Sequence, residues 1–110
     1  MDKETEKKIG HLQLIEQNLQ GILVQKQQFQ TQLIEIDSAL KELENTKEAF
    51  KIVGNIMVSS NKDDLKKDLE QKKETVELRI KTIEKQEKSL REKAGGMQSE
   101  IVKQLKPEKK

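Results

Sequence analysis

The stretch FKIVGNIMVSSN, residues 50–61, lies near the midpoint of the 110-residue chain and decides its fold. Two short runs of mostly β-branched and apolar residues flank Gly54-Asn55, a pattern that predicts a β-hairpin with a two-residue turn. That turn fixes the expected cross-strand pairs as Val53 with Ile56, Ile52 with Met57, and Phe50 with Ser59. We therefore predict a hairpin over about residues 50–59.

Apolar residues before the hairpin follow the spacing of a coiled-coil seam, which predicts a long helix over about residues 5–48. This first seam consists of Leu12, Ile15, Leu19, Ile22, Phe29, Leu33, Ile36, Leu40, Leu43 and Phe50. Only Lys26 and Lys47 interrupt it.

A second seam follows the hairpin and predicts another long helix, over about residues 61–105. Its main positions recur every seven residues, at Leu69, Val76, Ile83, Leu90 and Met97. The complementary positions hold Ile80, Ala94 and Ile101, while Lys73 and Glu87 dilute the seam. An N-cap at Ser60 or Asn61 begins this helix, and Pro107 ends it and leaves residues 106–110 as a tail.

Folding the two helices back on each other brings their seams into register. The expected opposite pairs are Leu40 with Leu69, Ile36 with Val76, and Ile22 with Leu90. The sequence thus predicts a mainly α fold with a single domain over residues 1–110. In it, a long antiparallel coiled-coil helical hairpin carries a short β-hairpin at its turn.

The composition supports long helices rather than a compact core. Charged residues make up 38% of the chain, hydrophobic residues 32% and aromatic residues 2%, which is too little bulky apolar material for a globular interior. Disorder is the alternative for so polar a chain, and the sustained heptads argue against it. The net charge of +2 comes from interleaved charges, so no basic stripe for nucleic acid is present. With no Cys, no signal peptide and no membrane-length apolar run, we expect a soluble cytoplasmic protein.

The sequence contains no arrangement of residues that predicts catalysis. His11 is the only histidine and is expected on the surface, and no Cys or second His offers metal-ligand spacing. The carboxylates lie on solvated helix faces, and Gly54 has no phosphate-loop companions. We predict no enzyme activity and no cofactor.

The hairpin has two apolar faces, which two helices cannot both cover. One face carries Phe50, Ile52 and Met57, and the other carries Val53, Ile56 and Val58 beside Lys51. A lone two-stranded hairpin is marginal in water and leaves both edges open. We therefore interpret it as an oligomerisation element that joins other hairpins in an intersubunit sheet or barrel, rather than as a kinked loop. Its residues are Phe50, Ile52, Val53, Gly54, Asn55, Ile56, Met57 and Val58.

At these residues the chain resembles the β-class prefoldin subunits, archaeal members above all. AFKIVGNIMV (49–58) looks like the family's central V-Y-K-x-x-G-x-x-x-V segment, with Ala49-Phe50-Lys51 standing for Val-Tyr-Lys. The run from Leu69 to Leu90 and the Gln-rich stretch 17–33 are also similar. α-class subunits carry two hairpins between their helices, and there is room for only one here.

The resemblance implies an ATP-independent molecular chaperone, a holdase. Two α and four β subunits would join their hairpins into a β-barrel platform, from which coiled-coil arms hang. Unfolded protein clients would be gripped near the arm tips and delivered to a group II chaperonin. The tip residues that this implies are Ile9, Leu12, Leu14, Ile15, Met97, Ile101, Val102 and Leu105.

Two questions stay open at the tip. Leu14, Val102 and Leu105 lie off the seam or widen it and are the better candidates for client contact, whereas Leu12, Ile15, Met97 and Ile101 equally suit the core. Gly95-Gly96 either bends the last turns of the second helix or is a tolerated weakness.

Two alternative functions remain. The first is a coiled-coil structural or adaptor protein that oligomerises through its β-hairpin. The second is a nucleic-acid-binding arm, against which the intermixed charges weigh.

Overall fold

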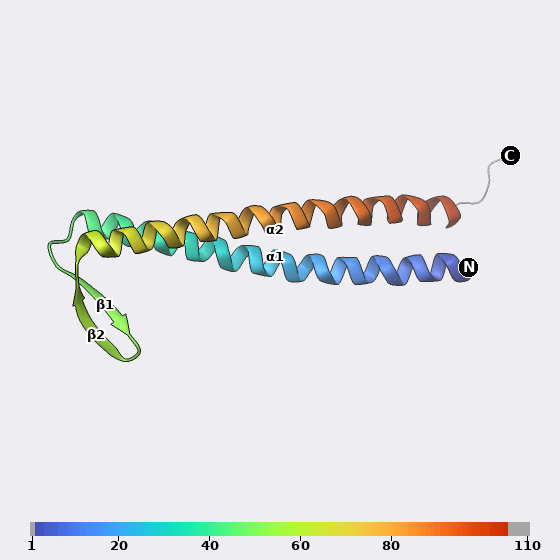
Figure 1. Cartoon of the computed structure of the whole chain (residues 1–110). Helices are drawn as coiled ribbons and strands as arrows, with labels where there is room; N and C mark the ends of the chain where they lie inside the picture. The colour runs from blue at the N-terminus through green and yellow to red at the C-terminus, as the bar shows by residue number, and fades with distance from the viewer. Residues whose placement is uncertain (1, 106–110) are drawn as a thin grey trace. The chain divides into compact units, whose positions relative to one another are not determined.

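The computed structural model describes residues 2–105 and consists of two long helices joined by a β-hairpin (Figure 1). In chain order the elements are α1 (Lys3–Glu44), β1 (Ala49–Val53), β2 (Ile56–Ser60) and α2 (Lys62–Leu105). The predicted mainly α fold with a short antiparallel β-hairpin between the helices is confirmed. α1 ends at Glu44 rather than at about residue 48, and α2 continues through Gly95-Gly96. Pro107 and the predicted tail, residues 106–110, lie outside the described residues.

Polar side chains cap the starts of both helices. The Asp2 carboxylate accepts a hydrogen bond of 2.7 Å from the backbone N–H of Thr5 at the start of α1. At the start of α2 the Asn61 side chain accepts one of 2.8 Å from the N–H of Asp63. Each cap satisfies a backbone donor that has no partner within its helix. Of the two predicted N-caps, Asn61 rather than Ser60 is therefore the one in use.

Hydrogen bonds to the last carbonyl groups of α1 determine where this helix ends. The Thr46 hydroxyl donates to the carbonyl oxygen of Glu42 at 2.6 Å, and the N–H of Asn45 donates to the same oxygen at 3.2 Å. The Lys62 ammonium, from the first turn of α2, lies 3.4 Å from the Glu44 carbonyl oxygen. These bonds replace helical ones, so the helix stops before the predicted boundary.

The β-hairpin has the predicted register. Val53 pairs with Ile56, Ile52 with Met57, and Phe50 with Ser59 in an antiparallel two-stranded sheet. Gly54 has a φ of 63°, and no other described residue has a positive φ. A type I′ turn needs positive φ at both central residues, so the turn fits type II′, with glycine first.

Contacts between residues divide the chain into two compact units. Unit 1 combines Met1–Lys26 with Thr82–Lys110, and unit 2 consists of Gln27–Lys81. Each unit contains a segment of α1, a segment of α2 and its own part of the seam. The single domain over residues 1–110 stays a prediction.

Burial in both units follows the predicted heptads. The most buried apolar residues of the helices are Ile15, Ile83 and Ile101 in unit 1 and Val76 in unit 2, with 5–7% of their surface exposed. The other predicted seam residues of the helices are half-buried. Phe50 was predicted to end the first seam, and this was wrong, because it lies in β1 and is 53% exposed.

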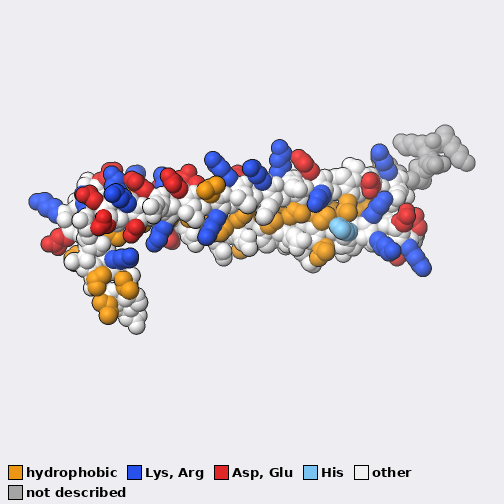
Figure 2. Space-filling view, viewed as in Figure 1, with side chains coloured by type: hydrophobic (Ala, Val, Ile, Leu, Met, Phe, Trp, Pro, Cys, Tyr) orange, Lys and Arg blue, Asp and Glu red, His pale blue; other side chains and the backbone are white. Residues whose placement is uncertain are grey.

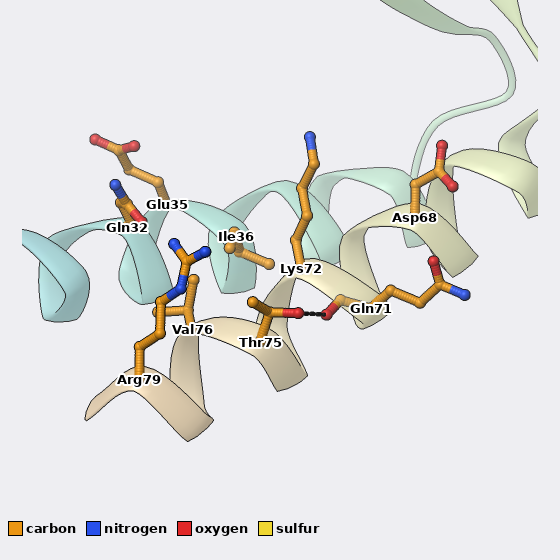
Figure 3. Close-up of a pocket in the computed structure, with 9 residues that line it drawn as sticks. All are labelled: Gln32, Glu35, Ile36, Asp68, Gln71, Lys72, Thr75, Val76 and Arg79. Atoms are coloured by element: carbon orange, nitrogen blue, oxygen red, sulfur yellow. Dashed lines mark hydrogen bonds between the residues drawn. The ribbon is translucent and has the colours of Figure 1, made fainter. Parts of the chain in front are cut away.

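Grooves between the helices agree with the predicted antiparallel register. Ile22 and Leu90 line one groove in unit 1, and Ile36 and Val76 line another in unit 2 (Figure 3). Each pair was predicted to face across the seam.

Candidate functional site

The hairpin exposes apolar side chains on both of its faces. Six large hydrophobic residues of β1 and β2 have between 42% and 68% of their surface exposed: Phe50, Ile52, Val53, Ile56, Met57 and Val58. Figure 2 shows hydrophobic side chains gathered over these strands. Lys51 is the only charged residue in either strand. Such a surface is costly in water and is typical of protein interfaces.

The helices of unit 2 bury only the first residue of the hairpin. Ala49, the first residue of β1, is 9% exposed. A groove of about 580 Å³ lies beside it, lined by Leu43, Leu65 and Leu69 of the helices and by Phe50 and Ile52 of β1, among others. Most of the hairpin therefore extends beyond this contact.

Each strand also has an edge without a partner in the described chain. The sheet has two strands only, so the outer backbone N–H and C=O groups of β1 and β2 are free to pair with another strand. Strand addition at such an edge supplies main-chain hydrogen bonds, while the apolar faces supply buried area. The hairpin thus has both features that a shared sheet requires.

A second surface lies at the end of unit 1 where α1 starts and α2 ends; we call it the tip. The Thr5 hydroxyl donates a 2.6 Å hydrogen bond to the Gln104 side-chain oxygen, and Thr5 is only 2% exposed. Lys8 and Glu100 form an ion pair of 3.3 Å beside it. These polar contacts join the two helices at the tip.

Sequence reasoning missed Thr5 and Gln104, although a signal was present. Counting one heptad back from Leu12 reaches Thr5, and counting one heptad on from Met97 reaches Gln104. A seam defined only by apolar residues stops before both.

The predicted tip residues differ in exposure. Ile15 and Ile101 are buried, while Ile9, Leu12 and Met97 are half-buried. Leu14, Val102 and Leu105 are 55%, 44% and 52% exposed. Only these last three offer large apolar side chains to a partner without a change in helix packing.

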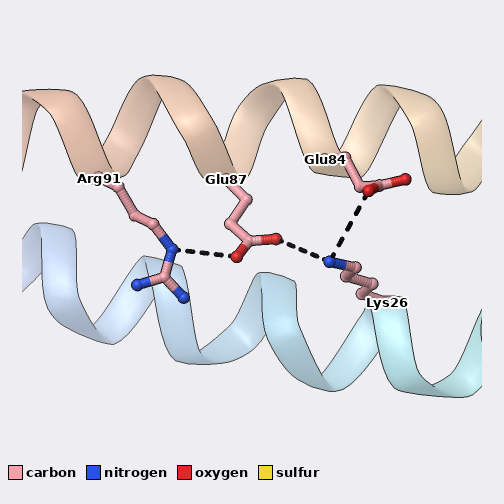
Figure 4. A network of polar contacts seen from close by, with 4 residues as sticks. All are labelled: Lys26, Glu84, Glu87 and Arg91. Carbon is pink, nitrogen blue, oxygen red and sulfur yellow. Dashed lines mark hydrogen bonds and ion pairs between the residues drawn. The ribbon is translucent and has the colours of Figure 1, made fainter.

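Lys26 and Glu87, which interrupt the two seams in unit 1, pair with each other. In unit 1, Lys26 Nζ lies 3.1 Å from an Oε of Glu87 and 4.0 Å from one of Glu84, and Arg91 contacts Glu87 at 3.0 Å (Figure 4). The hydrogen bonds from Lys26 and Arg91 hold the pKa of Glu87 below its usual range. The Glu87–Arg91 contact joins residues four positions apart on the same helix, a spacing that stabilises helices.

Unit 2 has a similar polar contact on its seam. Lys73 Nζ lies 2.9 Å from an Oδ of Asp37, and this hydrogen bond raises the pKa of Lys73. The Arg79 guanidinium lies 5.7 Å from the centre of the Phe29 ring, in cation–π range.

Within residues 2–105, no three His, Cys, Asp or Glu side chains gather closely enough to hold a metal ion. None of the helices in that part of the chain is long and apolar enough to cross a membrane. His11 is exposed on α1.

Comparisons with known proteins place this architecture in a class. The model of the family described as "Prefoldin subunit" matches residues 6–108, so the chain belongs to the prefoldin subunits, which are a family of chaperones. Prefoldin subunits assemble with one another into hetero-oligomers.

Within this family the chain is similar to beta subunits from archaea. The prefoldin subunit beta of Archaeoglobus fulgidus is 38% identical over 103 residues, which cover 91% of this chain and 89% of that protein. That of Thermococcus kodakarensis is 36% identical over 102 residues, covering 90% and 87%. The crystal structure of the prefoldin beta subunit from Thermococcus strain KS-1 superposes with a TM-score of 0.91 at 34% identity, covering 97% of this chain and 96% of that one. The resemblance to β-class prefoldin subunits is confirmed.

Proposed function

We propose that this chain is the β-type subunit of an ATP-independent holdase that captures unfolded proteins and delivers them to a group II chaperonin. Family membership supports the chaperone class. The observation that carries the assembly part is the hairpin, whose two faces both expose large apolar side chains in a single chain.

The hairpin is the assembly element of this proposal. Its open edges and apolar faces would be covered by hairpins of neighbouring subunits, joined into a closed sheet. We propose four copies of this chain and two α-type subunits in each complex. The helices would then extend from the shared sheet as arms.

The tip is the client-binding element. Leu14, Val102 and Leu105 offer exposed apolar area at the end of unit 1. Apolar side chains exposed in an unfolded protein would bind there weakly, and several arms acting together would raise the avidity. No step of this capture needs catalysis or a cofactor, and we place it in the cytoplasm, where a chaperonin would receive the client.

The first experiment measures solution mass by light scattering, for this chain alone and co-expressed with an α-type prefoldin subunit. The proposal predicts a hexamer that contains twice as many copies of this chain as of its partner. The purified hexamer should suppress aggregation of a denatured protein without ATP.

Two results would contradict the proposal at different points. A dimer that ignores the α-type partner would favour the coiled-coil adaptor. A hexamer that fails to suppress aggregation would support the proposed assembly and contradict the proposed holdase activity.

A further inference from the structure

One stretch of α1 is almost free of charge. Residues 17–34, QNLQGILVQKQQFQTQLI, contain a single charged residue, Lys26, in a chain that is 38% charged. That residue is engaged across the seam with Glu87 and Glu84 of α2. The rest of the stretch therefore presents amide, hydroxyl and apolar groups to solvent.

In unit 1 this stretch forms one wall of an uncharged groove of about 510 Å³. Gln17, Asn18 and Gln25 of α1 stand opposite Gln86 and Ser89 of α2. All five are exposed. The groove is in the size range of sites that bind small molecules.

The floor of this groove is apolar and open. Ile22 and Leu90, both half-buried, form the floor. Gly21 also lines the groove, and a Cβ added there would meet nothing within 4 Å. The missing side chain leaves space above the floor for a guest.

The groove amides have no partners within the described chain. Across residues 2–105, no side-chain hydrogen bond involves Gln17, Asn18, Gln25 or Gln86. A carboxamide offers two donors and one acceptor oxygen, which match the C=O and N–H groups of a peptide backbone. Those groups are the same in every sequence.

Other grooves of the described chain have a different chemistry. The groove of unit 2 in Figure 3 is lined by Glu35, Asp68, Lys72 and Arg79 around Ile36 and Val76. Charged linings select a guest by its charge, because like charges repel. An uncharged lining tolerates acidic and basic guests alike.

We propose that the amide-lined groove of unit 1 binds an extended segment of a non-native polypeptide, with its backbone on the amides and one apolar side chain over Ile22 and Leu90. This rests on the proposed function and extends it, because client contact then continues from the tip along the arm. Such a site reads the backbone rather than the sequence, as a holdase for many clients requires.

Cross-linking from single cysteines tests the proposal in the complex with the α-type subunit. The sequence contains no Cys, so each introduced thiol is unique in this chain. Gln86→Cys places a maleimide-linked benzophenone in the groove. Gln28→Cys is the control on the same uncharged stretch outside the groove, and Lys103→Cys reports on the tip. The client is reduced, carboxymethylated lactalbumin, which cannot refold.

The proposal predicts client adducts from Gln86→Cys and Lys103→Cys and at least several-fold fewer from Gln28→Cys. Adducts from Lys103→Cys alone would contradict client binding in the groove but would still agree with the proposed function. If none of the three variants formed client adducts, the proposed client binding would be contradicted, and the groove proposal, which rests on it, would fall as well. Adducts between Gln86→Cys and another subunit, with or without client, would assign the groove to assembly and overturn the proposal.

A charge substitution provides a second test. Gln25→Glu with Gln86→Glu introduces two carboxylates into the groove, while Gln27→Glu with Gln28→Glu makes the same change in net charge outside it. Binding of the acidic carboxymethylated client should weaken about threefold in the groove variant only, the size expected for exposed charges. Equal binding by the two variants would contradict the proposal.

Discussion

Lys26 and Glu87, the charged residues that interrupt the seams of α1 and α2 in unit 1, lie opposite each other with Nζ and Oε1 3.1 Å apart. Each is mostly shielded, with 23% and 15% of its side chain exposed. A charge on a seam is tolerated when its partner sits across from it, and a shifted register would separate Lys26 from Glu87. We interpret this pair as a device that specifies the antiparallel register.

Replacing one member of this pair should destabilise the chain more than replacing both. Lys26→Met leaves Glu87 with Arg91 alone, and Glu87→Leu leaves Lys26 with the more distant Glu84 at 4.0 Å. The double variant restores an apolar seam, so its melting temperature should equal or exceed that of the unmodified chain. Thermal unfolding followed by circular dichroism measures all four proteins. Additive losses in the double variant would show that the two residues are not coupled.

The same carboxylate should make stability depend on pH. Because the pKa of Glu87 is lowered in the folded chain, its contribution is present above the unfolded pKa of about 4.3 and is lost as pH falls below that value. The melting temperature of Glu87→Gln should therefore fall less than that of the unmodified chain between about pH 5 and pH 3. Glu74→Gln, at an exposed position of the same helix, is the control and should keep the full dependence. Parallel curves for the two variants would contradict the assignment.

The contribution of Lys73 to stability should be lost as pH rises, whereas that of Glu87 is lost as pH falls. Its pKa is raised by Asp37, so its contribution is present below the unfolded pKa of about 10.4 and is lost as pH rises through the folded value. Lys73→Met should lose less stability than the unmodified chain between about pH 9 and pH 11.5. Melting curves over that interval test this, with Lys72→Met as the neighbouring control. Identical losses in the two variants would exclude a role for the Asp37 contact.

The hairpin was predictable from sequence because its turn admits one register. Two residues, Gly54 and Asn55, separate the strands, and a shift of one residue would exchange the two faces of the sheet. The helical seams were predictable for a similar reason, since apolar residues hold one phase over many heptads. The polar seam positions were read only as interruptions. Their partners follow from continuing the heptad register through polar positions, which a seam defined only by apolar residues leaves out.

The end of α1 and the tip contacts were less accessible to sequence reasoning. The stop at Glu44 depends on Thr46 and Lys62, whose hydrogen bonds require the fold before they exist. The exposure of Leu14, Val102 and Leu105 follows from their positions off the first seam or beside the second. The proposed client binding would involve several subunits together, so no single-chain pattern specifies it.

Alanine at Gly95 and Gly96 should stabilise α2. Both residues are exposed within the helix, and an added Cβ would meet nothing within 4 Å at either position. Each Gly→Ala change should raise the free energy of unfolding by about 0.5–1 kcal/mol, because alanine has the higher helix propensity. Urea titration of Gly95→Ala, Gly96→Ala and the double variant measures the gain. No gain would mean that the glycines relieve a strain that the helix geometry does not reveal.

The hairpin variant Ile52→Lys with Ile56→Lys should lose assembly and keep its helices. Ile52 and Ile56 are 68% and 65% exposed on opposite faces, so lysine is tolerated in the single chain and disfavoured in a buried sheet. Light scattering should show no hexamer with the α-type subunit, while circular dichroism stays helical. Ile34→Lys, at an exposed apolar residue of α1, is the control and should still assemble. If the hairpin variant still formed a normal hexamer, the hairpin would not be part of the assembly surface.

Serine at Leu14, Val102 and Leu105 should weaken client capture without affecting assembly. These side chains are about half exposed, so their removal costs the folded arm little, whereas a bound client loses apolar area at every arm. Loss of about 1 kcal/mol per arm would reduce affinity roughly fivefold for each arm engaged. Ile34→Ser with Val24→Ser removes exposed apolar residues elsewhere on α1 and should leave aggregation suppression unchanged. If the two sets of substitutions reduced suppression equally, exposed apolar area in general, rather than the tip, would account for client binding.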